Sequence, residues 1–155
     1  MITVGQRRPW RRLALCVGVG LAGCAQQPAP PLATNPSPAQ EVKAVVQNQV
    51  QITFPPGSSR LSHEADAQLD LAARLFRDVN PVAMFSIGYT DPRGSELRNI
   101  QLSAMRAWTV KQALVARGIP PDRVMIQALG ASDPANAADP RAPENRRVLI
   151  KWRII

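Results

Sequence analysis

The chain has 155 residues, which allows one domain of ordinary size and some additional sequence. Its formal net charge is +8, but four arginines lie within residues 7–12. Removing these four leaves +4 on residues 24–155, too mild a charge to favour a nucleic-acid partner. One histidine, His63, and two cysteines near the N-terminus, Cys16 and Cys24, make no ligand set for zinc, so we expect no metal and no cofactor.

The first 23 residues have the pattern of an export signal. Residues 7–12 are basic, and residues 13–21 (LALCVGVGL) form an apolar run far shorter than the roughly 20 residues that span a bilayer. The run ends in Leu21, Ala22, Gly23 and Cys24, which resembles the bacterial lipobox. The resemblance implies that residues 1–23 are a lipoprotein signal peptide and that Cys24 carries the covalent lipid. An ordinary signal peptide that happens to contain a cysteine is the alternative.

Residues 24–41 are expected to be the lipidated cysteine and a tether. Residues 25–40 (AQQPAPPLATNPSPAQ) contain five prolines, no charge and no hydrophobic periodicity. Such a segment favours an extended conformation and, at about 3.1 Å per residue, reaches roughly 50 Å. Residue 25 is alanine, not aspartate, and by analogy with bacterial lipoproteins this favours an outer-membrane location, with the domain facing the periplasm.

Residues 42–155 are expected to form the globular domain. Hydrophobic periodicity, Ser62 as a plausible N-cap, and Gly or Pro breakers predict a strand over 45–54, a helix over 62–80, a strand over 82–89, a helix over 95–117, a strand over 123–129, an irregular loop over 130–144 and a strand over 148–152. This alternation of strands with two amphipathic helices predicts one sheet with the helices packed on a face. His63, in the first turn of the first helix, is expected at the surface.

One face of the second helix is polar in its N-terminal half and apolar in its C-terminal half. At 100° per residue this stripe comprises Asn99, Ser103, Arg106, Val110 and Leu114. If its apolar half faces the sheet, Arg106 lies over the end of the preceding strand, beside Asp91. An arginine on an inward-facing line is costly unless it is paired or opens into a cleft. Two interpretations remain open: an Arg106–Asp91 ion pair that ties the helix to the loop, or a binding site.

Several spaced motifs resemble the OmpA-like C-terminal domain. They are Gly88, Tyr89, Thr90, Asp91, Gly94, Asn99, Leu102, Ser103, Arg106, Ala107, Val110, Leu114, Gly118, Gly130, Pro134, Asn145, Arg146, Arg147, Val148 and Ile150. The resemblance implies an α/β (α+β) sandwich with βαβαββ order: one mixed four-stranded sheet with the helices packed on one face. Together with the lipobox, the whole chain resembles peptidoglycan-associated lipoproteins.

This resemblance implies non-covalent binding of peptidoglycan through the diaminopimelate of its stem peptide. Asp91 matches the family aspartate that accepts hydrogen bonds from an ammonium group, and Arg106 matches the arginine that holds a carboxylate. A guanidinium suits that role because it forms planar, charge-assisted hydrogen bonds. Thr90 and Asn99 match further lining positions. Arg147 matches less closely, and a solvated arginine at the start of a strand is the alternative there.

The chain departs from the family pattern after the first strand, and the outer face of its second helix carries large apolar residues. The family usually has an acidic residue after the phenylalanine of the first strand, whereas here Phe54 is followed by Pro55, Pro56 and Gly57, so we expect an altered pocket rim. Met105 and Trp108 fall on the helix face turned away from the sheet. An exposed tryptophan indicates either a surface for an envelope protein partner or an isolated exposed aromatic.

The sequence therefore predicts an outer-membrane lipoprotein that binds peptidoglycan and tethers the outer membrane to the cell wall. The alternative is a wall-anchoring lipoprotein subunit of a larger envelope machine, such as a secretion, conjugation or pilus system. An enzyme is not expected, because a metal-dependent wall hydrolase needs about three protein ligands and an open position, which His63 and a lipidated cysteine do not supply.

Overall fold

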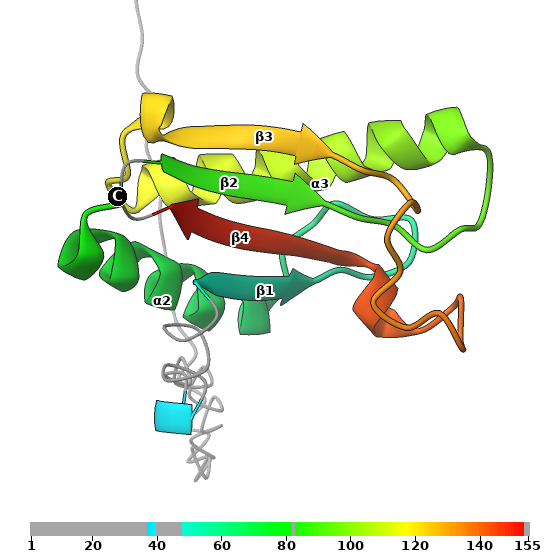
Figure 1. Ribbon diagram of the computed structural model, residues 1–155, viewed down its shortest axis with the longest axis horizontal. Coiled ribbons are helices and arrows are strands. Elements are labelled where there is room, and N and C mark those ends of the chain that lie inside the picture. The colour runs from blue at the N-terminus through cyan, green and yellow to red at the C-terminus, as the bar shows by residue number, and fades with distance from the viewer. Residues whose placement is uncertain (1–36, 40–47, 82, 154–155) are drawn as a thin grey trace, which may run out of the picture. The chain divides into compact units, whose positions relative to one another are not determined.

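The computed structural model describes residues 37–39, 48–81 and 83–153 (Figure 1). Its elements are β1 (Gln49–Thr53), α2 (His63–Val79), β2 (Ala83–Gly88), α3 (Glu96–Ala116), β3 (Val124–Ala128) and β4 (Arg147–Arg153), with short 3-10 turns at Pro121–Arg123 and Pro143–Asn145. This order confirms the predicted arrangement of strands and helices. The predicted signal peptide, Cys24, nearly all of the tether and the first residues of the predicted 45–54 strand lie outside the described residues.

The four strands form one mixed sheet in the order β1-β4-β2-β3. The last strand, β4, lies between β1 and β2 and runs antiparallel to both, whereas β2 and β3 are parallel. The parallel pair requires a crossover, which α3 provides. The sheet confirms the predicted fold class and brings the end of β2, the start of α3 and the loop after β1 to one edge of the domain (Figure 1).

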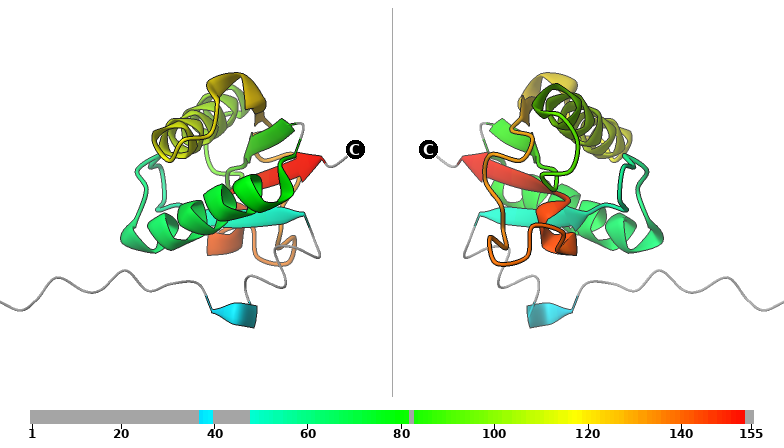
Figure 2. Two further views of the ribbon diagram at one scale, coloured as in Figure 1. Left: turned by 90° about the vertical axis from the view of Figure 1, so that its left-hand side faces the viewer. Right: turned by 90° about the vertical axis from the view of Figure 1, so that its right-hand side faces the viewer.

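Both helices cover the same face of the sheet (Figure 2). Because side chains alternate along a strand, every second residue points into the space between the layers. The buried apolar side chains of this core are contributed by all four strands and both helices; the largest of those that are fully buried are Ile52, Leu69, Leu71, Met84, Leu114 and Ile150. Full burial of one such side chain contributes about 1.5–3 kcal/mol, so this layer is the main source of stability. No helix in the described ranges is both long enough and apolar enough to cross a bilayer.

The helix α3 packs on β2 at unusually close range. The Ser86 hydroxyl donates to the carbonyl oxygen of Ala107 at 2.9 Å, and the Gly130 N–H donates to the Ser103 hydroxyl at 3.0 Å. A Cβ atom added at Gly88 would lie 2.0 Å from the carbonyl oxygen of Ser103, so only glycine allows this approach. Small residues thus set the height of α3 above the sheet.

Local signals define the limits of α3. The Ser95 hydroxyl accepts a hydrogen bond from the Arg98 N–H at 3.3 Å, as an N-cap does. At the other end Gly118 has a φ of +90°, a left-handed conformation that stops the helix without strain. Ser62 occupies the predicted N-cap position of α2 in an extended conformation, although its side chain makes no capping hydrogen bond.

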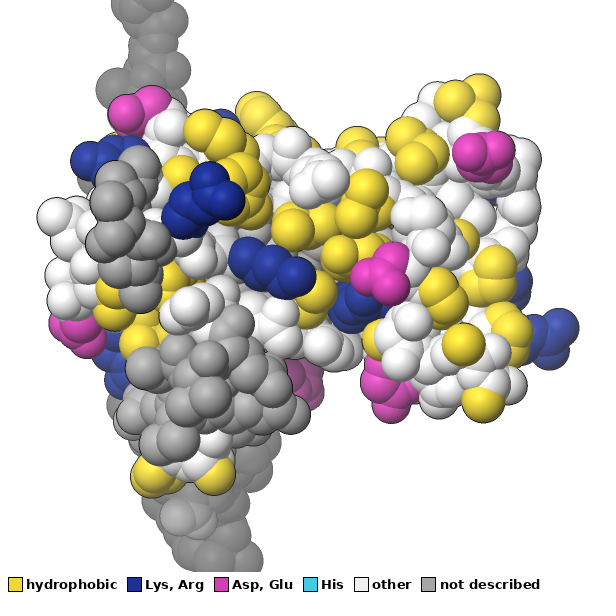
Figure 3. All heavy atoms as spheres, viewed as in Figure 1, with side chains coloured by type: hydrophobic (Ala, Val, Ile, Leu, Met, Phe, Trp, Pro, Cys, Tyr) yellow, Lys and Arg dark blue, Asp and Glu magenta, His cyan; other side chains and the backbone are white. Residues whose placement is uncertain are grey.

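On the other face of the sheet no helix of the described residues is packed (Figure 2). A smaller apolar cluster lies there, built on Ile87, Tyr89 and Leu149, with Phe85 and Leu129 packed against it. Figure 3 shows hydrophobic side chains gathered over the middle of this face, with basic side chains among them. The domain therefore has one closed core between helices and sheet and one partly open sheet face.

Candidate functional site: a charged pocket at the start of α3

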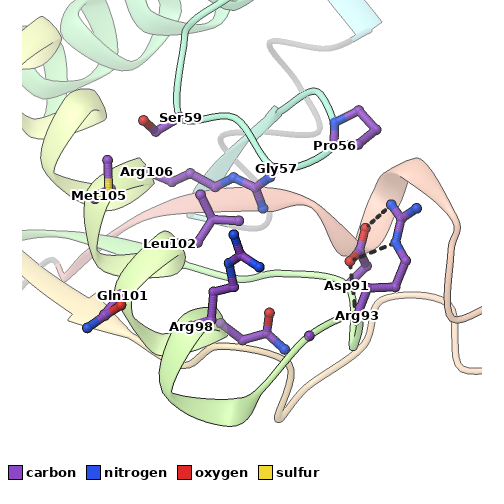
Figure 4. A pocket seen from close by; sticks show the side chains of 12 residues that line it. Pro56, Gly57, Ser59, Asp91, Arg93, Arg98, Gln101, Leu102, Met105 and Arg106 are labelled. Carbon is purple, nitrogen blue, oxygen red and sulfur yellow. Dashed lines mark hydrogen bonds and ion pairs between the residues drawn. The ribbon is translucent and has the colours of Figure 1, made fainter.

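A pocket of about 630 Å³ lies between the first half of α3, the turn after β2 and the loop after β1 (Figure 4). Its lining residues are Pro56, Gly57, Ser59, Asp91, Arg93, Gly94, Arg98, Asn99, Gln101, Leu102, Met105 and Arg106. Three of the predicted site residues, Asp91, Asn99 and Arg106, are thus brought to one place. The sequence Pro55–Gly57, where an altered rim was predicted, contributes two of the lining residues.

Arg106 is completely buried, and backbone carbonyl groups hold its guanidinium. Its Nε donates to the carbonyl oxygen of Ser58 at 2.8 Å, Nη1 donates to that of Tyr89 at 2.9 Å, and Nη2 donates to that of Pro55 at 3.0 Å. These bonds tie α3 to the loop after β1 and to the end of β2. Three of its five N–H groups are used in this way, which leaves two for other acceptors.

Among the described residues, no acidic side chain is in direct contact with the guanidinium of Arg106. Burial lowers the pKa of its guanidinium to about 10, and the negative charge of Asp91 opposes that shift. The guanidinium also lies over the Phe54 ring, 5.3 Å from its centroid, in a cation–π contact. Arg106 therefore remains a buried cation at neutral pH, stabilised by dipoles and an aromatic ring.

Asp91 is paired with two other arginines. Its carboxylate accepts hydrogen bonds from Arg93 Nη2 at 2.6 Å and Nε at 3.2 Å, and Arg146 Nη1 lies 3.6 Å away. The Arg93 hydrogen bonds lower the pKa of the Asp91 carboxyl below its usual 3.8, against the opposing effect of burial. The ion pair that the sequence allowed between Arg106 and Asp91 is absent; Arg106 ties helix to loop through carbonyl oxygens instead, and Asp91 is held by Arg93.

Of the two predicted site residues Asn99 and Thr90, one lines the pocket and the other does not. Asn99 is buried at the start of α3 and lines the pocket directly. Thr90 is buried but does not belong to the lining; its N–H donates to the carbonyl oxygen of Gly130 at 2.8 Å. Its Oγ1 is the one buried side-chain N or O atom, among the residues that the structure describes, without a hydrogen-bond partner. Of these two predicted site residues, the structure therefore places only Asn99 in the pocket lining.

Arg147 is not brought to the pocket. Its guanidinium stacks over the Tyr89 ring at 3.9 Å and donates to the carbonyl oxygen and the carboxylate of Asp133, on the sheet face that carries no helix. The alternation of side chains along a strand could have predicted this orientation. Val148 and Ile150 face the helices, so Arg147 must face the opposite side of the sheet.

Sequence reasoning missed three arginines of this region. Arg93 pairs with Asp91, Arg98 lines the pocket, and Arg146 lies behind Asp91 with its Nε donating to the carbonyl oxygen of Phe54 at 3.1 Å. Arginine in a polar turn or at the start of a helix is ordinarily solvated, so Arg93 and Arg98 were not assigned to the site, and Arg146 was noted only as part of the family motif. The two-residue spacing of Asp91 and Arg93 across a turn was the one available signal.

The pocket can bind ionic groups of both signs. It presents one carboxylate and three guanidinium groups, which is suited to a ligand that carries carboxylate and ammonium groups together. The single histidine, His63, lies exposed at the start of α2 with its Nδ1 3.9 Å from an Asp66 carboxylate oxygen. Within residues 37–39, 48–81 and 83–153, no group of three or more His, Cys, Asp or Glu side chains is arranged to hold a metal ion.

Comparison with known proteins assigns the fold and site to a family. The sequence pattern of the OmpA family matches residues 53–147, which include both helices, β2, β3 and all of the pocket. The chain belongs to the OmpA family. It is 33% identical over 150 residues to the outer membrane protein A of Bordetella avium, a match that covers 92% of this chain and 73% of that protein.

Two further relatives match over shorter stretches. The probable lipoprotein YiaD of Escherichia coli is 33% identical over 101 residues, which are 64% of this chain and 46% of YiaD. The peptidoglycan-binding protein ArfA of Mycobacterium bovis is 48% identical over 65 residues, which are 41% of this chain and 20% of ArfA. The chain thus spans less than half the length of these two relatives.

Solved structures show the same fold. The peptidoglycan-associated lipoprotein from Burkholderia pseudomallei superimposes with a TM-score of 0.61 at 23% identity, over 67% of this chain and 90% of that one. The C-terminal domain of Helicobacter pylori MotB superimposes with a TM-score of 0.62 at 21% identity, over 68% of this chain and 84% of that one. The mixed sheet with two helices on one face is therefore the OmpA-like fold.

Proposed function

We propose that this chain is an outer-membrane lipoprotein whose OmpA family domain binds peptidoglycan non-covalently and so tethers the membrane to the cell wall. In this proposal residues 1–23 are the signal peptide, Cys24 carries the lipid, residues 24–41 are the tether and residues 42–155 are the binding domain. Relatives named outer membrane protein, probable lipoprotein and peptidoglycan-binding protein support it. Multiple acyl chains would hold the protein at the membrane, because each buried CH₂ adds about 0.8 kcal/mol of membrane affinity.

The observation that carries the proposal is the pocket that gathers Asp91, Asn99 and Arg106 with charges of both signs. The ligand is the diaminopimelate of the stem peptide, which offers carboxylate and ammonium groups at a fixed separation. Asp91 accepts hydrogen bonds from the ammonium group, and the remaining N–H groups of Arg106 donate to a carboxylate. Thr90 stays behind this contact, and Arg147 steadies the loop at Asp133.

Arg93 has a defined place in this binding step. Its guanidinium occupies the Asp91 carboxylate, yet its side chain is 50% exposed, against 10% for Asp91. An ammonium group that enters the pocket replaces Arg93 at that carboxylate, and the half-exposed Arg93 guanidinium becomes hydrated as it moves into solvent. Binding is then an exchange of partners at Asp91 and needs no uncompensated buried charge.

Sedimentation with peptidoglycan tests the proposal. The full chain, purified from envelopes in detergent, should co-sediment with sacculi that contain diaminopimelate, and free diaminopimelate should compete. Asp91→Ala and Arg106→Ala should each bind about ten- to a hundred-fold more weakly, because a hydrogen bond to a charged group contributes about 1.5–3 kcal/mol. Arg106→Lys, which keeps the charge and loses the planar fork, should fall between Arg106→Ala and wild type.

Matched controls lie at the other end of α3. Arg117 Nε pairs with an Asp70 carboxylate oxygen at 2.7 Å, away from the pocket, so Asp70→Ala and Arg117→Ala each remove one carboxylate or one guanidinium group from outside the pocket. Both controls should sediment as wild type does. Thermal melts must show that every variant is folded, since Arg106 also holds the loop after β1. Folded Asp91→Ala and Arg106→Ala variants that sediment like wild type would exclude this pocket as the binding site.

A second candidate function is wall anchoring within a larger envelope machine. The observation that favours it is the outward face of α3, where Trp108 and Met105 are 55% and 56% exposed, as predicted from the helical periodicity, and Leu97 is exposed as well. Exposed large apolar side chains mark surfaces for protein partners. Crosslinking in intact envelopes followed by co-purification distinguishes the candidates: a partner lost in Trp108→Ser favours the machine, whereas peptidoglycan alone favours the tether.

A further inference from the structure

The charges of the pocket do not balance once its internal pairs are counted. Among the lining residues, Arg93 is matched by Asp91, with which it forms two side-chain hydrogen bonds. Arg106 is held by three carbonyl groups, which carry no net charge. Arg98 is a third guanidinium, and it pairs with no acidic side chain of the described residues. Two positive charges in the lining therefore lack a counter-charge.

Of the two arginines that lack a counter-charge, Arg98 and Arg106, only Arg98 is accessible to solvent. Its side chain is exposed, whereas Arg106 is fully buried beneath the loop after β1. Figure 4 shows the Arg98 guanidinium pointing from the first turn of α3 into the same space that the guanidinium of Arg106 faces. Its backbone N–H is occupied by the Ser95 cap, so the orientation of the residue is set by the helix start.

The nearest acid in the sequence does not compensate Arg98. Glu96 precedes it by two residues, a spacing that places the two side chains on different sides of the helix. Glu96 lines not this pocket but an adjoining hollow between α3 and the end of β3. The positive charge of Arg98 thus faces the pocket, and an anionic ligand group is the partner that its position suits.

We propose that Arg98 is a second carboxylate-binding residue of the pocket, so that the site selects stem peptides with two free carboxylates over their amidated forms. The inference rests on the proposed function and extends it from one carboxylate to two. The second carboxylate belongs either to diaminopimelate itself or to the neighbouring glutamate of the stem peptide; both present the same planar acceptor to a guanidinium. An amide in that place offers one acceptor and no charge, and it points N–H groups at a cation.

The test compares three synthetic stem tripeptides that end in diaminopimelate. One is unmodified, one carries an amide on the diaminopimelate side chain, and one carries an amide on the glutamate. Binding to the full chain in detergent is measured by calorimetry at low salt, since screening weakens exposed ion pairs. Wild type should lose about two- to five-fold in affinity with the amide that faces Arg98, the range expected of an exposed charge pair.

The Arg98→Gln variant decides the assignment. It should bind the unmodified peptide about two- to five-fold more weakly than wild type and show no further loss with that same amide, which identifies the source of the carboxylate. Arg77→Gln, which removes an exposed arginine from the last turn of α2, should keep the wild-type preference. Because Gln retains the capped backbone N–H, the variant should fold.

Two outcomes overturn the inference in distinguishable ways. If wild type and Arg98→Gln are weakened by each amide to the same extent, or if wild type ignores both amides, Arg98 does not bind a carboxylate while the proposed function stands. If wild type binds none of the three peptides, the proposed function falls, and this inference falls with it.

Discussion

Gly88→Ala tests how strictly the sheet sets the position of the binding helix. The added Cβ would lie 2.0 Å from the carbonyl oxygen of Ser103 and 2.8 Å from its carbonyl carbon. Carbon–oxygen contacts in proteins are about 3.3 Å or longer, so α3 must move outward by roughly 1.3 Å. The clashing atoms are backbone, and no side-chain rotation can relieve them.

The expected cost follows from the bonds that hold α3. An outward shift of that size breaks the Ser86–Ala107 and Gly130–Ser103 hydrogen bonds, which are 2.9 and 3.0 Å long. Two lost hydrogen bonds at about 1 kcal/mol each, added to an overpacking cost of about 1–3 kcal/mol, destabilise the domain by roughly 3–5 kcal/mol. For a domain of about 100 residues, 3 kcal/mol alone lowers Tm by roughly 12–24 °C.

Thermal and urea unfolding followed by circular dichroism measure this effect. The comparison variant is Gly57→Ala, because Gly57 has a φ of +62° but nothing within 4 Å of an added Cβ. It carries only the left-handed penalty of about 1–2 kcal/mol. Since α3 also carries Asn99 and Arg106, Gly88→Ala should weaken peptidoglycan binding as well. A Gly88→Ala melt within 2–3 °C of wild type (roughly 0.5 kcal/mol) would refute the reasoning.

Three further predictions concern the anchor, the tether and the pH response. Cys24→Ala should abolish acylation in cells, and radioactive palmitate incorporated by that variant would contradict a lipid on Cys24. Replacing residues 25–40 with another Pro-rich segment of equal length should preserve wall association in cells, whereas deletion should weaken it; equal loss from both changes would mean that the segment is itself recognised. The pKa of Asp91 is lowered by Arg93, so the stability that Asp91 contributes is complete above pH about 4 and is lost as pH falls through the lowered pKa. The difference in unfolding free energy between wild type and Asp91→Asn should therefore shrink from pH 4 to pH 2 in urea titrations, and a constant difference would contradict this ion pair.

Local signals in the sequence were sufficient for the order and limits of the elements. The second helix was predicted over 95–117, and the structure ends it at these limits because the Ser95 hydroxyl caps its start and Gly118, in a left-handed conformation, follows its last turn. The inward stripe of that helix was also predictable, since Asn99, Ser103, Arg106, Val110 and Leu114 are all buried at helical spacing. The gathering of Asp91, Asn99 and Arg106 at one pocket followed from the same periodicity and the family motif.

The partners of the charged groups were decided by the tertiary structure alone. Arg106 bonds to carbonyl groups of Ser58 and Pro55, 48 and 51 residues away, and backbone carbonyls carry no mark in a sequence. The sequence likewise allowed Asp91 to pair with Arg106, but the turn after β2 places Arg93 against the Asp91 carboxylate instead. Periodicity specifies which way a side chain points, whereas the choice among possible partners depends on the height of α3 above the sheet and the path of the loop after β1. Those distances are set by packing between segments far apart in the chain, at Gly88 against Ser103 above all.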